Sequence, residues 1–386
     1  MPVVAPSSAE DLAHVLKDAA SNFQTIAVSG NHSKRFMAGP VLPADVTLST
    51  AKLRRVLAYE PNDLTLSVEA GMPFADVQKL LASHGQMIAL DPPHSAEATI
   101  GGTIATNSSG PMRRAFGTAR DLVIGMSLAT LDGKLVKTGG MVVKNVAGLD
   151  IGKLMIGSFG TLAVITSINF RVHALPREMR TFLFSFNDLE AAIERRNSIV
   201  RGVLQPLAID LMSPAAAARL GSRGYLVAVR AGGSETVLSR YARELRDSEQ
   251  LTGDRDAQLW QQIREFSPEF LRRQPGGIVV RVSTGLSGIV DLLRLATGPC
   301  ISRAASGVSY LYLTSWQGVA PVWKAASERD WSAVIEYAPD EIRAAKDLWL
   351  SPSCGIESAG FAMMKKVKHM FDPNTLLNRL RLYGRI

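Results

Sequence analysis

The pattern of apolar and polar positions divides the chain into two regions. In the first, apolar residues recur on one helical face between residues 12 and 19, behind serines that can cap a helix. Apolar runs at 25–28 and 64–68 predict strands, Pro73 suits the start of another helix, and an Asp-Gly pair at 132–133 predicts a hairpin. Strands and helices do not alternate regularly here, so this region is expected to be α+β.

The second region begins near residue 177, after a closing strand at 161–172 and a break at Pro176. Its expected strands are 181–186, 225–229, 278–282 and 308–313, and its expected helices are 189–200, 235–245 and 286–296. This pattern predicts an antiparallel sheet with helices on one face, which forms a cap domain.

Composition sets the broad class of the protein. With 386 residues, 46% hydrophobic and only 20% charged, the chain can bury two cores and does not have the composition of a disordered protein. Its net charge of +8 favours anionic ligands or acidic partners. We expect no nucleic-acid binding, because no aromatic-rich RNA motif or basic helix accompanies that charge.

The sequence also predicts a cytoplasmic protein that does not enter a membrane. The N-terminus lacks a basic segment followed by an apolar one, and glycines break the longest uncharged run, 154–170. Two cysteines, Cys300 and Cys354, make neither a disulfide framework nor a metal site, and they cannot hold an iron–sulfur cluster by themselves. Cys354 is expected to be a small packing residue and not a reactive thiol.

Glycines, hydroxyl residues and amides gather between short apolar runs at 98–110, 117–121 and 157–166. Glycine allows backbone to approach a ligand closely, and free N–H groups at a turn or helix start can hold an anion. Neither a Walker sequence nor a Gly-x-Gly-x-x-Gly after a strand is present. The sequence therefore predicts a phosphate-bearing ligand held by a different kind of nucleotide site.

Five blocks in this order resemble the FAD-linked oxidases whose fold is shared by vanillyl-alcohol oxidase and p-cresol methylhydroxylase. They resemble most the FAD-binding subunits of bacterial glycolate oxidases. The blocks are Val-Ser-Gly-Asn-His-Ser-Lys-Arg at 28–35, Thr-Ile-Gly-Gly at 99–102, Lys-Asn-Val-Ala-Gly-Leu-Asp at 144–150, Ser-Phe-Gly-Thr-Leu at 158–162, and the tail at 371–383.

The resemblance implies a two-subdomain FAD-binding fold of the p-cresol methylhydroxylase type with an antiparallel α+β cap. The domains expected from it are an FAD-binding domain at 1–176, a cap at 177–355 and a segment at 356–386 that returns to the flavin domain. FAD is expected as a non-covalent cofactor, and no metal is expected.

The resemblance also implies a set of cofactor-binding residues. N–H groups of the first glycine turn and of the Thr-Ile-Gly-Gly block would hold the pyrophosphate, and others would line the flavin channel or approach the adenosine. The expected residues are Gly30, Asn31, His32, Ser33, Thr99, Ile100, Gly101, Gly102, Thr106, Asn107, Gly110, Gly160, Thr161, Val164, Asn378 and Arg381. Lys144 is a catalytic candidate, as a cation at the edge of the reduced flavin, or simply a solvated lysine.

The first turn departs from the family pattern. Ser29 replaces arginine, and Asn31-His32 replace two glycines, which predicts a weaker FAD site. Some relatives attach FAD through a histidine in this turn, but here Ser33 occupies that position. His32 is therefore expected to lie beside the phosphates without a covalent bond.

Histidines are absent from the whole cap, since none occurs between Ala174 and Lys368. Related enzymes that oxidise 2-hydroxy acids carry a histidine metal pair there, and a histidine that takes the hydroxyl proton. The chain is thus expected to lack a complete hydroxy-acid site. The resemblance assigns that role to a sister FAD-containing subunit, with an iron–sulfur subunit accepting the electrons.

Three functions remain open from the sequence. The first is an FAD-binding subunit of a glycolate oxidase or dehydrogenase. The second is a self-sufficient FAD-dependent 2-hydroxy acid or alcohol dehydrogenase, in which Lys144 or Tyr310 would act as the base. The third is a structural subunit with a degenerate flavin fold, which the altered first turn favours and the intact block at 99–110 opposes.

Overall fold

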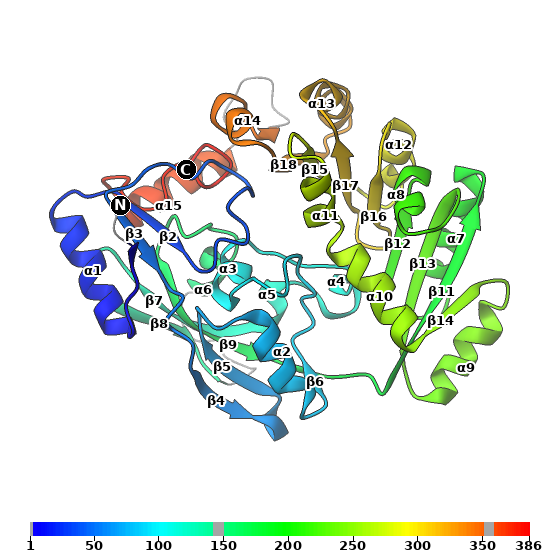
Figure 1. The fold of residues 1–386 in the computed structure, drawn as a ribbon, viewed down its shortest axis with the longest axis horizontal. Coiled ribbons are helices and arrows are strands. Elements are labelled where there is room, and N and C mark those ends of the chain that lie inside the picture. The colour runs from blue at the N-terminus through cyan, green and yellow to red at the C-terminus, as the bar shows by residue number, and fades with distance from the viewer. Residues whose placement is uncertain (1–2, 142–149, 351–358) are drawn as a thin grey trace.

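The computed structural model describes residues 3–141, 150–350 and 359–386. Figure 1 shows two lobes, with the first part of the chain in blue to cyan on one side and the cap in green to yellow on the other. The C-terminal helix, in red, lies back against the blue N-terminal strands.

A small parallel sheet with one covering helix begins the chain. Its strands are β1 (Val3–Val4), β2 (Ile26–Ser29) and β3 (Val46–Ser49), in the order β1-β3-β2. Helix α1 (Ala9–Ser21) starts where the sequence predicts, because the Ser8 hydroxyl accepts a hydrogen bond from the Asp11 N–H at 3.0 Å. The apolar face of α1 is buried against this sheet and β7.

A five-stranded antiparallel sheet forms the second part of the first lobe. Its order is β4-β5-β9-β7-β8. The predicted hairpin is confirmed, since β7 and β8 pair directly and Gly133 has the positive φ (79°) that the turn needs. The strands are β4 (Val56–Glu60), β5 (Thr65–Glu69), β7 (Val123–Ala129), β8 (Leu135–Gly139) and β9 (Val164–Arg171).

Short helices connect and cover these strands. They are η1 (Pro61–Asp63), α2 (Phe74–Ala82), α3 (Ile100–Ala105), α4 (Arg113–Phe116), α5 (Ala119–Leu122) and α6 (Gly152–Met155). Two short strands, β6 (Gln86–Met87) and β10 (His173–Ala174), pair with each other where the chain leaves for the cap.

The cap is built on one antiparallel sheet, whose order in the described residues is β14-β11-β13-β12-β16-β17-β15-β18-β19. Its strands are β11 (Glu178–Phe186), β12 (Ala208–Met212), β13 (Tyr225–Gly233), β14 (Glu249–Thr252), β15 (Ile278–Ser283), β16 (Cys300–Arg303), β17 (Val308–Leu313), β18 (Ser332–Tyr337) and β19 (Trp349–Leu350). Its helices are α7 (Leu189–Arg201), α8 (Pro214–Arg219), α9 (Glu235–Glu244), α10 (Gly253–Arg264), α11 (Phe266–Arg273), α12 (Gly288–Leu295), η2 (Trp316–Gly318), α13 (Val319–Glu328) and α14 (Asp340–Ala345).

Helices cover both faces of the cap sheet, so the prediction of one covered face is wrong. Neighbouring residues of a strand point to opposite faces. In β11, Phe182 stacks on Tyr241 of α9, whereas Thr181 accepts a hydrogen bond from the Trp260 indole of α10. The buried apolar residues on both faces explain why the strands read as continuous apolar runs.

The final helix, α15 (Ala359–Phe371), is followed by a segment that lies beside β2. The Ile26 N–H donates to the Leu376 carbonyl and the Asn378 N–H donates to the Ile26 carbonyl, both at 2.8 Å. The buried Lys368 ammonium donates to the carbonyls of Thr161 (2.8 Å) and Leu377 (3.0 Å). These contacts attach the segment to the first lobe, while the domain boundaries themselves stay predictions.

A polar network is buried between α10 and the cap sheet. The Asp256 carboxylate accepts from the Thr181 hydroxyl (2.5 Å) and from the Arg230 guanidinium (2.7 Å). Trp260, which is 1% exposed, donates its indole N–H to Thr181 at 2.6 Å. The other tryptophans are also buried in the cap core or packed against it.

Replacing Asp256 by alanine should destabilise the cap. Arg230 would lose its ion-pair partner inside the protein, a change that costs about 3–5 kcal/mol. Denaturant unfolding of Asp256→Ala measures this loss, and Asp254→Ala, an exposed position on the same helix, is the matched control. Equal stability of the two variants would contradict the expectation.

Candidate cofactor site

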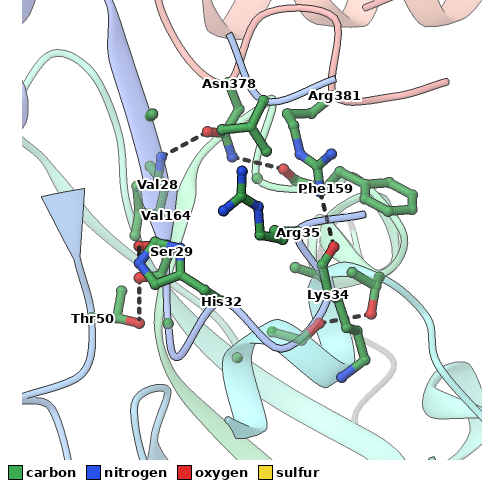
Figure 2. Close-up of a pocket in the computed structure, with 18 of the residues that line it drawn as sticks. Val28, Ser29, His32, Lys34, Arg35, Thr50, Phe159, Val164, Asn378 and Arg381 are labelled. Atoms are coloured by element: carbon green, nitrogen blue, oxygen red, sulfur yellow. Dashed lines mark hydrogen bonds between the residues drawn. The ribbon is translucent and has the colours of Figure 1, made fainter. Parts of the chain in front are cut away.

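A cavity of about 380 Å³ has four walls, which come from the beginning, the middle and the end of the chain. Its walls are the first glycine turn, the loop at 41–44, helix α3 and the paired segments around Phe159 and Asn378. Figure 2 shows these segments converging on one space. The volume lies in the range of small-molecule and cofactor sites.

The first glycine turn presents unused backbone donors to this cavity. Among the described residues, no protein acceptor binds the N–H groups of Gly30, Asn31, His32 and Ser33. His32 adopts the left-handed conformation (φ 55°), and its ring lies 3.2 Å from the Ser29 hydroxyl. The altered turn therefore leaves four backbone N–H groups available at the cavity wall, and their role as anion donors stays a prediction.

Gly30 is also required by close packing. A Cβ atom there would lie 2.4 Å from the Thr99 hydroxyl oxygen, so the turn can touch the start of α3 only without a side chain. The Asn31 amide donates to the Glu97 carbonyl at 2.9 Å and holds the turn against the same region.

The N-terminus of α3 has a different role from the one expected. The Ile100 N–H donates to the Met72 carbonyl (2.9 Å) and the Gly101 N–H to the Ala70 carbonyl (2.7 Å). The Gly102 N–H is bound by the Thr99 hydroxyl (3.2 Å), and the Thr103 N–H by the Thr99 carbonyl (2.9 Å). The expectation that these four N–H groups are pyrophosphate donors is therefore wrong, because each has a protein partner.

Thr99, Gly101, Gly102 and Thr106 nevertheless line the cavity. Ile100 does not, since its side chain is buried in the core of the five-stranded sheet. Glycine at 101 lets α3 lie directly on β5, because a Cβ atom would come within 2.7 Å of the Ala70 Cβ.

The opposite wall depends on Asn378. Its side-chain oxygen accepts from the Val28 N–H at 2.7 Å, and its amide donates to the Phe159 carbonyl at 2.8 Å (Figure 2). Gly160 has a positive φ (68°), and a Cβ there would lie 2.7 Å from the Asn378 amide. Gly160 and Val164 line the cavity, but Thr161 is buried and bonds the Ser158 carbonyl.

Arg381 lines the cavity with its guanidinium held by the protein. It donates to the carbonyls of Met37 (2.9 Å), Lys34 (3.4 Å) and Gly39. Burial, helped by repulsion from Arg343, lowers the pKa of Arg381 to about 10. Arg381 thus orders the chain from 34 to 39 around the cavity.

The sequence analysis missed Lys34. This lysine lines the cavity, is 7% exposed, and its ammonium has no hydrogen-bond partner in the described parts of the chain. Burial lowers its pKa to about 8, although Glu265 opposes that shift. Its position directly after the glycine turn could have marked it as a candidate. Its burial could not be predicted, because it depends on how the cap packs against the first lobe.

Asn107 and Gly110 lie elsewhere, in a smaller cavity that meets the first at Thr106. This second cavity also contains Tyr310, the alternative base. Lys144 and Cys354 lie outside the described residues. Cys300 is buried, and burial raises its pKa to about 12, so it is no reactive thiol.

The residues present fit FAD. The free N–H groups at 30–33 and the buried Lys34 match a pyrophosphate, and the apolar side chains of Val28, Val41 and Val164 give the cavity nonpolar walls. The turn, α3 and the C-terminal segment all contribute residues to this one cavity.

Comparison with known proteins agrees with this geometry. Residues 2–139 match the family model "FAD binding domain", and residues 355–382 match "FAD linked oxidases, C-terminal domain". The chain is 35% identical over 251 residues to the glycolate oxidase subunit GlcE of Escherichia coli, covering 65% of this chain and 66% of that protein.

The chain belongs to the FAD-linked oxidases. FAD is therefore its cofactor. It is also 31% identical to a D-lactate dehydrogenase of Archaeoglobus fulgidus over 54% of this chain and 47% of that protein. The chain thus spans between about half and just under two thirds of these relatives.

Solved structures show the same fold. A 4-ethylphenol oxidase from Gulosibacter chungangensis matches with a TM-score of 0.75 and 16% identity, over 99% of this chain and 89% of that one. p-Cresol methylhydroxylase matches with a TM-score of 0.75 and 14% identity, over 99% and 88%. The predicted fold class is confirmed by these matches.

The described residues lack a metal cluster and a membrane-spanning helix. They contain no cluster of three or more histidine, cysteine or acidic residues placed to bind a metal ion. They also contain no helix whose length and apolar character would let it cross a bilayer.

Replacing Asn378 by alanine should open the cofactor site. The Val28 N–H and the Phe159 carbonyl would lose their partner, at a cost of about 2–4 kcal/mol in unfolding free energy. FAD affinity, measured by fluorescence titration of the apoprotein, should fall together with stability. Asn374→Ala, an exposed position in the same segment, is the control and should change neither quantity.

FAD affinity should decrease as the pH rises above about 8. Lys34 is charged below that pH and neutral above it, so its attraction for the pyrophosphate is lost there. Glu265 and His94 are the titratable groups that interact with it electrostatically. Titrations from pH 6 to 10 should show this step in the parent and not in Lys34→Met.

Lys34→Arg is the control for charge, because arginine stays protonated across this range. It should bind FAD without the step near pH 8. A step of equal size in all three proteins would assign the titration to another group.

Proposed function

We propose that the chain is the FAD-binding subunit of a multi-subunit glycolate, or 2-hydroxy acid, oxidase or dehydrogenase. The observation that carries the proposal is the 35% identity to the Escherichia coli glycolate oxidase subunit, together with a formed FAD cavity. The absence of histidine between 174 and 368 supports it, because a cap without histidine needs another source of substrate chemistry.

In this function the chain acts as an FAD-dependent oxidoreductase subunit with non-covalent FAD. Bound FAD supplies two-electron redox chemistry. The N–H groups at 30–33 and Lys34 hold the pyrophosphate, and Asn378 and Arg381 fix the walls around it. A sister FAD-containing subunit and an iron–sulfur subunit complete the proposed complex, which contacts any membrane through those partners.

A self-sufficient dehydrogenase is the second candidate. The second cavity, which meets the FAD cavity at Thr106, is the observation that favours it. The structural-subunit alternative is disfavoured by the open FAD cavity and its free donors.

The test is anaerobic addition of glycolate to the purified chain, followed by the visible flavin spectrum. The proposal expects a yellow protein whose flavin stays oxidised until the partner subunits are added. Bleaching in the chain alone would establish the self-sufficient enzyme, and a protein that cannot take up FAD would establish the structural subunit.

Acid precipitation of the same sample checks the mode of FAD attachment. The flavin should appear entirely in the supernatant. Yellow colour that stays in the precipitate would show a covalent bond and would contradict non-covalent binding.

A further inference from the structure

The second cavity, of about 80 Å³, lies between the first lobe and the inner face of the cap sheet. Thr106 to Gly110 form one side, and side chains from β15, β16, β17 and β18 form the other. This volume is about a fifth of that of the FAD cavity, so a two- or three-carbon molecule suits it better than a long one.

Guanidinium groups dominate its lining. Arg113, Arg264, Arg281 and Arg303 face it, against the single carboxylate of Glu336. Burial lowers the pKa of Arg113, and repulsion from Arg281 and Arg303 lowers it further. Arg113 is therefore a half-buried guanidinium beside two others, and an anion bound between them would stabilise its charge.

Carboxylates of the protein pair with three of these four arginines. Asp91 and Glu265 pair with Arg264 at 2.9 and 3.4 Å, Asp210 pairs with Arg303, and Glu336 lies 3.6 Å from Arg281. Arg113 has no ion pair with any residue in the described ranges. Arg113 is thus the arginine of this wall that no carboxylate of the described residues holds at ion-pair distance, although Glu336 interacts with it electrostatically.

Unused polar atoms point to a missing ligand. The Nε atoms of Arg281 and Arg303 and the hydroxyl of Tyr337 are buried without a hydrogen-bond partner in the described structure. Tyr337 is only 2% exposed, and all three residues line the cavity. Buried polar atoms are rarely left unbonded, and several on one small cavity are expected where a polar ligand binds.

We propose that this cavity binds a small carboxylate anion through its arginines, without a metal ion. Planar guanidinium groups match a carboxylate with paired hydrogen bonds. Glu336, whose pKa is raised by burial although Arg281 opposes the shift, accepts a hydrogen bond from a hydroxyl on the neighbouring carbon. The ligand class is a two- or three-carbon 2-hydroxy acid.

This inference rests on the proposed function and deepens it. It assigns to this chain an acid-binding site built from arginines of both lobes, although no complete site is expected from the sequence. Binding of the acid and its oxidation are thereby separated: the chain holds the carboxylate even if the flavin here does not accept its electrons.

The test is calorimetric titration of the FAD-loaded chain with oxalate, a carboxylate that cannot be oxidised by hydride loss. Binding should occur and should persist in EDTA. Arg113→Met should weaken it at least tenfold, whereas Glu336→Gln should tighten it, because the only negative charge on the cavity wall is removed. Opposite changes cannot both result from misfolding.

Arg114→Met is the matched control, since it removes the same charge at the next position, where the guanidinium bonds Gln205 at 3.2 Å. It should leave oxalate affinity unchanged. Equal weakening in both arginine variants, or loss of binding in EDTA, would overturn the proposal. A yellow chain that binds no oxalate would overturn this inference and leave the FAD function standing, whereas a colourless chain would overturn the FAD function.

Discussion

The cofactor site depends on the Asn378 side chain. It bonds the Val28 N–H at the end of β2 and the Phe159 carbonyl before β9, while its own N–H bonds Ile26. These contacts join parts of the chain that are hundreds of residues apart. The Asp372 carboxylate holds the residues just before Asn378, because it accepts hydrogen bonds from the N–H groups of Leu376 (2.9 Å) and Leu377 (2.8 Å). The four walls therefore form as one unit.

The two neighbouring cavities differ in the kind of hydrogen-bond donor that lines them. In the larger one the donors are mostly backbone N–H groups, with Lys34 as a single buried ammonium. Backbone donors are rigid and suit a cofactor that stays bound. In the smaller one the donors are arginine side chains from both lobes, Arg113 of the first lobe and Arg281 of the cap among them. A site shared between lobes suits a small ligand that enters and leaves.

Much of the fold was predictable because its signals are local. Ser8 caps a helix, residues 132–133 form a turn, and apolar runs form the strands of the cap domain. Each of these features is determined by a few neighbouring residues. The site was less predictable, because a glycine-rich block suggests close packing without saying against what. Ile100 packs into the protein core and not against a ligand. The burial of Lys34 and of Glu336 depends on how the cap lies on the first lobe.

The arrangement of the walls also sets the order in which the site can be assembled in the cell. The ribosome releases the first glycine turn early, but Asn378 and Arg381 are made only near the end of these 386 residues. FAD can therefore be captured only after the cap has been synthesised and the C-terminal segment has returned to β2. The cavity with its four walls is therefore complete only when the C-terminal segment lies beside β2.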